Sequence, residues 1–113
     1  MEIFKSLNTS DIIKDFEISD YKRWQDGYYL KLKITLKDNT VLFVREYADN
    51  IERNYSFHWQ DTDNKLIVRW DNACHHRHIK TYPHHKHIDE TVRESFDISL
   101  NEVLLYIEQH ERI

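Results

Sequence analysis

The stretch "YYLKLKITL", residues 28–36, alternates apolar and polar side chains with a period of two. In an extended chain its aliphatic residues would lie together on one side: Leu30, Leu32, Ile34 and Leu36. Strict alternation is typical of a half-buried antiparallel strand, whereas a helix groups residues three or four positions apart. The stretch therefore predicts an antiparallel sheet with one apolar face.

Four further segments extend this predicted sheet. Three of them repeat the alternation with aromatic and β-branched residues: "VLFVREY" (41–47), "RNYSFHWQ" (53–60) and "KLIVRWDN" (65–72). A weaker strand is predicted at "IKDFEISD" (12–19). Hairpin turns are expected in "LKDNTV" (36–41) and "QDTDNKL" (60–66), because Asp and Asn side chains readily bond nearby backbone. We therefore expect a sheet of four to six strands.

The C-terminal segment "SLNEVLLYIEQHERI", residues 99–113, changes to a helical period. Its apolar residues recur three or four positions apart: Leu100, Val103, Leu104 and Ile107. Ser99 and Glu102 have the spacing of a capping box at a helix N-terminus. The predicted fold is thus α+β, with one C-terminal amphipathic helix packed on one face of the sheet. Residues 1–11 are compatible with either a short helix or an edge strand.

The hairpin turns also predict how the strands pair. If Asp38 and Asn39 form a two-residue turn, Leu36 faces Val41 and Ile34 faces Phe43. Symmetric turns further along the chain then place Phe43 beside Phe57 in the core, and Glu46 on the solvent face. The polar end of the apolar face would hold four residues near the end of the strand at 65–72: Arg45, Tyr47, Tyr55 and Trp70.

The composition limits the class of protein. A chain of 113 residues is long enough to bury a core, and we assign residues 1–113 to a single domain. One cysteine, Cys74, excludes an internal disulfide and a Cys-rich zinc site. There is no apolar run of the roughly 20 residues that cross a bilayer, and "MEIFKSLNTS" lacks the apolar region of a signal peptide. We therefore expect a soluble cytoplasmic protein that does not associate with membranes.

The net charge of −4 argues against nucleic-acid binding through bulk electrostatics. A local basic pocket is still compatible with it, because Lys and Arg residues lie throughout the central strands and around one His-rich segment. That segment, "RWDNACHHRHIKTYPHHKHID" at residues 69–89, holds six of the eight histidines. We expect it to form a loop at one end of the sheet. Three interpretations compete: a metal site, a proton-transfer site, or an exposed loop without function.

The metal interpretation rests on histidine pairs three residues apart, namely His75 with His78 and His84 with His87. Such pairs can share a zinc, copper, nickel or iron ion. Neither cluster, however, contains an acidic ligand, and the chain has no Cys-x-x-Cys motif. A non-catalytic module that holds a metal or a nucleic acid in this loop is therefore the alternative to an enzyme.

The proton-transfer interpretation rests on imidazoles that titrate near neutrality, so that a pair can act as general base and general acid. RNA carries its own nucleophile, the 2′-hydroxyl, so this chemistry requires no cofactor. Arginine matches the geometry of phosphate, and aromatic rings stack on unpaired bases. The candidate catalytic residues are His75, His76, His84, His85, His87 and Arg45. The candidate RNA-binding residues are Arg69, Tyr47, Tyr55, Trp70 and Lys86.

Structural roles compete with some of these assignments. Tyr55 and Trp70 are also compatible with plain core positions. The Asp71-Asn72 pair is compatible with a turn, since Asx side chains bond the neighbouring backbone. Pro83 should stiffen the chain beside His84 and His85.

The stretches "YSFHWQD" (55–61) and "LIVRWDNACHHRHIKTYPHHKHI" (66–88) resemble the TumE-like toxin family of prokaryotic toxin–antitoxin modules. The similarity runs through residues 28–72, the "RWDNA-HH" and "PHHKH" motifs, and the closing helix. The positions that match the motifs are Arg69, Trp70, Asp71, Asn72, His75, His76, Pro83, His84, His85 and His87. Cys74 departs from the family pattern, which has proline there, and this exposes the entry of the loop to loosening or oxidation.

The resemblance implies a small toxin encoded beside a cognate helix-turn-helix antitoxin, similar in general plan to RelE-type ribonucleases. Together with the histidine and arginine chemistry, it leads us to expect a metal-independent ribonuclease that cleaves single-stranded RNA or mRNA. The expected partners are the antitoxin and RNA.

Overall fold

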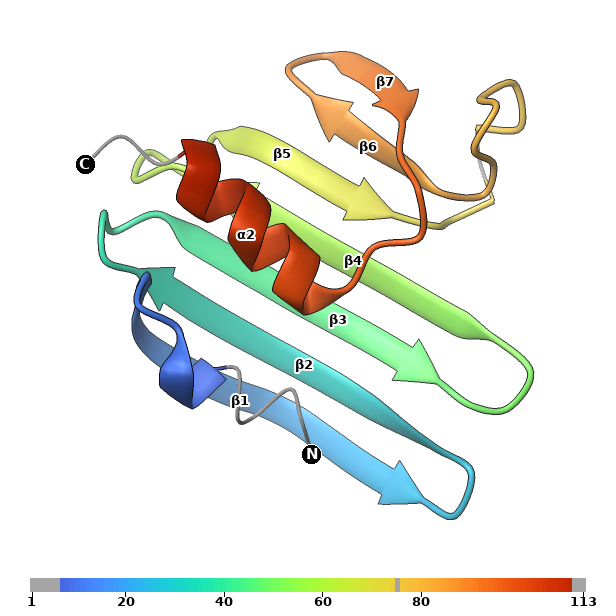
Figure 1. Cartoon of the computed structure of the whole chain (residues 1–113), viewed down its shortest axis with the longest axis horizontal. Helices are drawn as coiled ribbons and strands as arrows, with labels where there is room; N and C mark the ends of the chain where they lie inside the picture. Colours follow the sequence, from blue (N-terminus) through green and yellow to red (C-terminus); the bar gives the residue numbers. More distant parts are fainter. Residues whose placement is uncertain (1–6, 75, 111–113) are drawn as a thin grey trace.

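The computed structural model describes residues 7–74 and 76–110 and shows one antiparallel sheet with a helix across one face (Figure 1). The strands lie side by side in chain order, each paired with the next. They are β1 (Ile13–Trp24), β2 (Gly27–Leu36), β3 (Val41–Ala48), β4 (Arg53–Gln60), β5 (Leu66–Asp71), β6 (His85–Ile88) and β7 (Thr91–Glu94). Residues 7–9 are helical, and α2 (Leu100–His110) follows the last strand.

The sheet has seven strands, so the prediction of four to six was too low. The additional pair, β6 and β7, comes from the segment that the sequence predicted as a loop or left unassigned. Residues 85–88 alternate between the two faces of the sheet, but they contain histidine and lysine in place of the β-branched and aromatic residues that usually reveal a strand. The His-rich loop is thus confined to residues 72–84.

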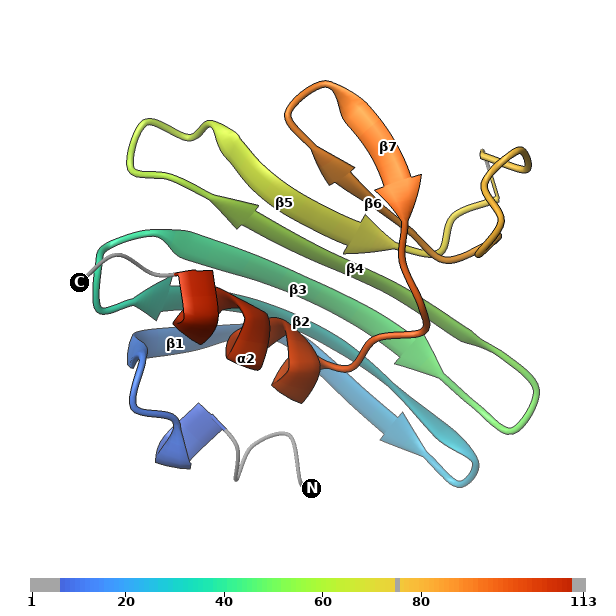
Figure 2. The same ribbon diagram turned by 45° about the horizontal axis from the view of Figure 1, so that its top comes forward.

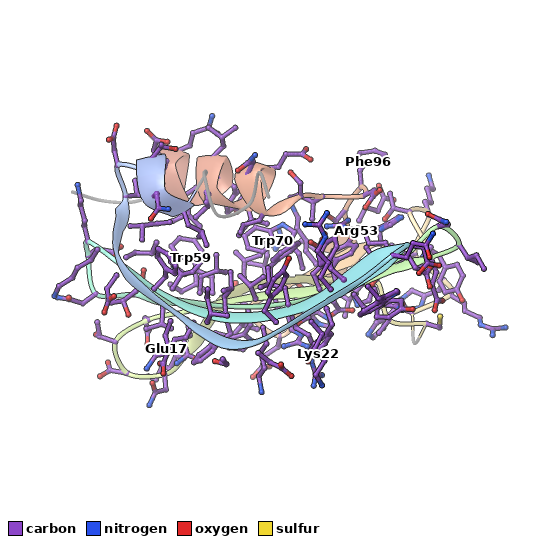
Figure 3. The ribbon with its side chains drawn as sticks, turned by 90° about the horizontal axis from the view of Figure 1, so that it is seen from below. Glu17, Lys22, Arg53, Trp59, Trp70 and Phe96 are labelled. Atoms are coloured by element: carbon purple, nitrogen blue, oxygen red, sulfur yellow. The ribbon has the colours of Figure 1, made fainter. Side chains whose placement is uncertain are left out.

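The predicted helix and its cap are confirmed. The Glu102 amide donates to Ser99 Oγ at 3.2 Å, and Glu102 Oε1 accepts from the Ser99 amide at 3.2 Å. The four residues predicted for the apolar stripe are all buried: Leu100, Val103, Leu104 and Ile107. The helix lies over the central strands (Figure 2). Seen edge-on, Trp59 and Trp70 lie between the sheet and the helix, whereas Glu17 and Lys22 project from the opposite face (Figure 3).

The register between β2 and β3 differs from the predicted one by a single residue. Thr35 pairs with Val41 and Ile34 with Leu42, because the turn contains three residues, Lys37 to Asn39, rather than two. Asn39 takes a left-handed backbone conformation with φ of 69°, which asparagine tolerates better than most residues. A shift of one residue moves every side chain of a strand to the other face.

The predicted faces of β3 are therefore all wrong, and Arg45 lies on the face opposite the helix instead of beside Tyr55 on the apolar face. Phe43 does not lie in the core; it is 39% exposed on the face opposite the helix. Glu46 is not a surface charge, since it is only 5% exposed and lies on the helix side. Leu42 and Val44 take the core positions instead, facing Trp59 and Phe57 of β4.

Buried Glu46 is satisfied by an ion pair that connects the sheet to the start of α2. Arg53 Nε donates to Glu46 Oε2 at 2.7 Å, and the Tyr28 hydroxyl donates to Glu46 Oε1. The same guanidinium donates to Asp97 Oδ1 at 2.6 Å and to the Ile98 carbonyl at 2.8 Å. Burial and the Glu46 carboxylate raise the pKa of Tyr28. Arg53 thus holds the segment that precedes the helix against the sheet.

Candidate active site on the open face of the sheet

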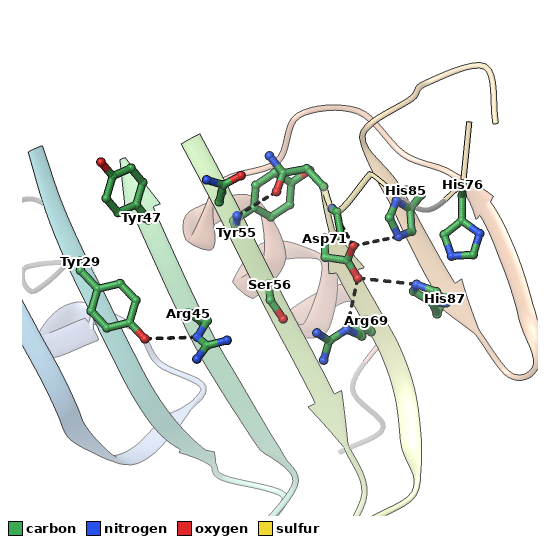
Figure 4. Close-up of a pocket in the computed structure, with 13 residues that line it drawn as sticks. Tyr29, Arg45, Tyr47, Tyr55, Ser56, Arg69, Asp71, His76, His85 and His87 are labelled. Carbon is green, nitrogen blue, oxygen red and sulfur yellow. Dashed lines mark hydrogen bonds and ion pairs between the residues drawn. The ribbon is translucent and has the colours of Figure 1, made fainter. Parts of the chain in front are cut away.

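A pocket of about 490 Å³ lies on the face of the sheet opposite α2, which we call the open face (Figure 4). Its lining comes from strands β2 to β6 and from the loop that follows β5. The chemically active side chains that line it are Arg45, Arg69, Asp71, His76, His85 and His87. These residues come together because Arg45, Arg69, Asp71, His85 and His87 alternate onto the same face of adjacent strands.

Asp71 is the centre of the site. Its carboxylate is buried, and Oδ2 accepts a hydrogen bond from Arg69 Nε at 3.2 Å. Oδ1 accepts from the Ala73 amide at 3.0 Å and lies 2.8 Å from His85 Nε2. His87 Nε2 lies 3.6 Å from Oδ2. One buried carboxylate is therefore surrounded by a guanidinium and two imidazoles, which offset the cost of burying its charge.

His85 has a fixed orientation. Its ring is 1% exposed, and Nδ1 donates to the Pro83 carbonyl at 2.9 Å, because a carbonyl oxygen can only accept. Nε2 therefore points toward Asp71, yet within residues 7–74 and 76–110 it makes no directed hydrogen bond. Two acceptor atoms 2.8 Å apart repel each other, so this contact requires a positive species at Nε2, either a proton or a bound cation.

His76 and His87 complete a cluster with His85. The ring centroids lie 4.8 Å apart for His76 and His85, 5.4 Å for His76 and His87, and 4.9 Å for His85 and His87. Burial lowers the pKa of His87, and the neighbouring His85, His76 and Arg69 add to this effect, while Asp71 opposes it. His87 is therefore neutral at pH 7 and able to accept a proton.

Two arginines place positive charge on the pocket. Arg45 is exposed and its Nε donates to the Tyr29 hydroxyl at 3.2 Å. A second hollow, of about 450 Å³, shares Arg45, Ser56 and Arg69 with the pocket. It extends the open face toward a group of basic and aromatic residues: Lys31, Lys33, Phe43 and His58. The acidic chain thus carries a basic face.

Of the predicted site residues, Arg45, Arg69, His76, His85 and His87 line the same pocket. Tyr47 also lines the pocket; its hydroxyl donates to Asp49 at 2.6 Å, and this hydrogen bond raises the pKa of Tyr47 to about 12. His75 lies outside the described residues.

Other predicted site residues lie on the helix side. Trp70 is 1% exposed and packs edge-on against Tyr106 of α2, so its predicted role in base stacking is wrong. Lys86 also points toward the Tyr106 ring, with Nζ 5.8 Å from the ring centroid. His84 Nδ1 lies 2.8 Å from the Tyr55 hydroxyl.

Tyr55 borders the pocket but is buried on the core face, and this burial raises its pKa to about 12. Its amide donates to Asn72 Oδ1 at 2.9 Å, and Asn72 Nδ2 donates to the Arg53 carbonyl at 2.6 Å. Asn72 thus ties the exit of β5 to β4, whereas Pro83 supplies the carbonyl that orients His85.

Of the metal set suggested by the sequence, His75 lies outside the described residues, and of His78, His84 and His87 only His87 belongs to the cluster that converges among the described residues. His84 bonds Tyr55, and the cluster is formed by His76, His85 and His87. Asp71 was predicted only as a structural residue of a turn. An alternating pattern across 69–71 and 85–87 was the signal that could have placed its carboxylate among the histidines.

The sequence matches the family described as Toxin TumE over residues 3–111. A search of curated proteins and a search of solved structures each found no match. Within the described residues, none of the helical segments has the length and apolar character needed to cross a membrane.

Proposed function

Because the chain belongs to the TumE toxin family, we propose that it is the toxin of a toxin–antitoxin module and that its open-face pocket cleaves single-stranded RNA in the cytoplasm without a metal ion. One observation carries the proposal: two arginines and three histidines line the same pocket around a buried carboxylate. Phosphoryl transfer from a 2′-hydroxyl needs a base, an acid and a cationic phosphate site, and this set of side chains can supply all three.

In this proposal His87 is the general base and His76 the general acid. Neutral His87 takes the proton of the 2′-hydroxyl, and the freed oxygen attacks the adjacent phosphorus. The bond from phosphorus to the 5′-oxygen breaks, and protonated His76 gives its proton to that oxygen. The products are a 2′,3′-cyclic phosphate and a 5′-hydroxyl. His85 is too buried to touch the substrate and acts as a positioning residue through Asp71.

Arg45 and Arg69 would bind the phosphate whose charge develops in the transition state. Arg69 is held in place by Asp71, while Arg45 is free to turn from Tyr29 toward a ligand. Phe43 and Tyr29 provide exposed or half-buried rings on the same face against which unpaired bases can stack. A single strand fits such an open surface better than a duplex, whose bases are already stacked.

Arg45→Ala is the sharpest test of this placement. Because Arg45 is exposed, the variant should keep its melting temperature within a few degrees, while cleavage of single-stranded RNA in excess EDTA falls by about 100-fold or more. Arg45→Lys should rescue poorly, since lysine lacks the bidentate fork. Arg93→Ala, an exposed substitution on β7 away from the pocket, is the control. A folded and fully active Arg45→Ala protein would remove Arg45 from the phosphate site.

Membership in a toxin family implies an antitoxin partner. We infer that this partner is a helix-turn-helix protein that silences the toxin by covering the open-face pocket or by pairing with an outer strand, β1 or β7. Co-expression with the adjacent reading frame should relieve growth arrest and give a complex in size-exclusion chromatography. If neither result is obtained, this assignment of the partner fails.

A further inference from the structure

The cluster around Asp71 has the donor set of a transition-metal site. We propose that His76, His85 and His87 together bind one divalent ion of the zinc class, with a carboxylate oxygen of Asp71 available as the fourth ligand. This site goes beyond the proposed ribonuclease, which requires no metal, and it does not depend on that activity.

The spacing of the donor atoms fits one ion. One ring nitrogen from each histidine lies within 4.8 Å of the other two. Zinc–nitrogen bonds of about 2.0–2.1 Å place tetrahedral ligand nitrogens about 3.3–3.4 Å apart. The two ring nitrogens that lie furthest apart must therefore approach each other by about 1.5 Å at most to bind one ion. His85 and His87 are held on β6, whereas His76 belongs to the loop after β5 and can make this adjustment.

The unsatisfied Nε2 of His85 is the strongest indication that the cluster binds a cation. This atom is buried, faces a carboxylate at 2.8 Å and has no directed hydrogen bond among the described residues. Buried imidazole nitrogens are normally paired, so an unpaired one in a cluster with the ring nitrogens of His76 and His87 indicates a ligand. A metal ion would accept the lone pair of Nε2 and remove its repulsion with Asp71 at the same time.

The groups behind the cluster also resemble those that support metal sites. The Nδ1–H of His85 donates to the Pro83 carbonyl, which fixes the tautomer that leaves Nε2 free to coordinate. Asp71 is itself held by Arg69 Nε at 3.2 Å and by the Ala73 amide at 3.0 Å. His85 and Asp71 are thus oriented before an ion arrives, which lowers the cost of binding.

Occupancy by a metal and acid–base catalysis exclude each other, because both use the same nitrogen atoms. A bound zinc ion would take the lone pair that His87 needs to accept a proton. We therefore expect zinc to suppress any cleavage activity and EDTA to preserve it, so that the same cluster makes the toxin sensitive to metal supply.

The test measures metal binding directly and uses no RNA. Full-length protein freed of metal with EDTA and then dialysed is titrated with zinc against a chromophoric competing chelator. One equivalent should bind, and cobalt(II) at the same site should give the intense visible absorption of tetrahedral coordination. His76→Ala and His87→Ala should each weaken zinc binding by at least about tenfold, the smallest loss seen even when an outer partner of a metal site is removed.

Two neighbouring histidines provide matched controls. His78 is exposed and His84 is engaged by Tyr55, so His78→Ala and His84→Ala should keep the affinity of the parent protein. His76 and His87 are partly exposed, so their variants should fold, and circular dichroism checks that they do. Absence of stoichiometric binding, or binding that is lost with His78 or His84 rather than with His76 and His87, would overturn the site. RNA cleavage without zinc binding would refute the metal site alone, and zinc binding without cleavage would refute the ribonuclease alone.

Discussion

His58 lies on the open face beside Phe43, with Arg69 Nη1 at 3.3 Å from its Nδ1 and Gln60 Oε1 at 3.1 Å from its Nε2. Burial and, secondarily, the Arg69 cation lower the pKa of His58 below its usual value of 6.5, and the Gln60 hydrogen bond opposes them only in part. The folded protein therefore resists protonation at this residue, while the unfolded chain does not.

This difference predicts a pH dependence of stability. Well above pH 6.5 neither state is protonated at His58, and its effect on the free energy of unfolding is constant. As the pH falls below 6.5 the unfolded state binds the proton first, so stability decreases. Urea unfolding at pH 7.5 and at pH 5.5 should show a smaller loss in His58→Gln than in the parent protein, with His78→Gln as an exposed control. Equal losses in the parent and His58→Gln would contradict the assignment.

Phe43 and Phe57 make a second comparison, because they have the same side chain on adjacent strands but on opposite faces. Phe57 is fully buried, so Phe57→Ala should cost about 3–5 kcal/mol through lost burial and a cavity. Phe43 is 39% exposed, and Phe43→Ala should cost less than about 1 kcal/mol. If Phe43 stacks on bases, its loss should instead weaken RNA binding. Denaturant unfolding and an RNA-binding titration on both variants measure the two effects.

The elements themselves were largely predictable from the sequence. The five strands at 12–19, 28–36, 41–47, 53–60 and 65–72 all exist, and the helix begins at the predicted cap. These segments carry strong local signals, since side-chain alternation and capping residues act over only a few positions.

The faces of β3 were not predictable in the same way. A two-residue type I′ turn needs a left-handed conformation at both Asp38 and Asn39, whereas the observed three-residue turn has it at Asn39 alone. Asp and Asn are compatible with both turns, so the residue types do not decide between them. Both registers place apolar residues inward, as Val41 and Phe43 or as Leu42 and Val44. Packing of the whole sheet against α2 decides between them. Arg45 nevertheless lines the pocket with the histidines of β6, because they lie on the open face as well, whereas the predicted register had placed Arg45 on the apolar face.

The attachment of α2 to the sheet depends on the Glu46–Arg53 pair. Arg53→Met would leave the buried Glu46 carboxylate without its cation and should cost about 3–5 kcal/mol, nearer the lower value because Arg53 is partly exposed. Adding Glu46→Met should recover most of the lost stability, since the double variant no longer buries an unpaired carboxylate. Thermal unfolding of both variants measures this recovery. A double variant that is no more stable than Arg53→Met would contradict the inferred role of the pair.

At the scale of the whole molecule, the helix covers one face of the sheet and leaves the other uncovered (Figure 3). The covered face holds the core, from Leu30 on β2 to Trp70 on β5. The uncovered face gathers cations on a chain of net charge −4, which concentrates an attractive potential for polyanions at the pocket. The residues that stabilise the fold and the residues of the proposed chemistry thus lie on opposite faces of one sheet.

The alternation of side chains between the two faces of the sheet has an evolutionary consequence for the toxin. Along β3 the even-numbered residues 42, 44 and 46 face the core and the odd-numbered residues 41, 43, 45 and 47 face the pocket side; on β4 the parity is reversed. A library of single substitutions can be scored once for protein abundance and once for growth arrest. The two scores should distinguish the core-facing positions from the pocket-facing positions. Substitutions of the core-facing residues should lower the abundance of the protein. Substitutions of pocket-facing residues near Arg45 should abolish growth arrest while the protein remains abundant. Single mutations could therefore give toxin alleles that are harmless yet well folded. Their products would still bind the antitoxin, which would release any active toxin in the same cell from inhibition.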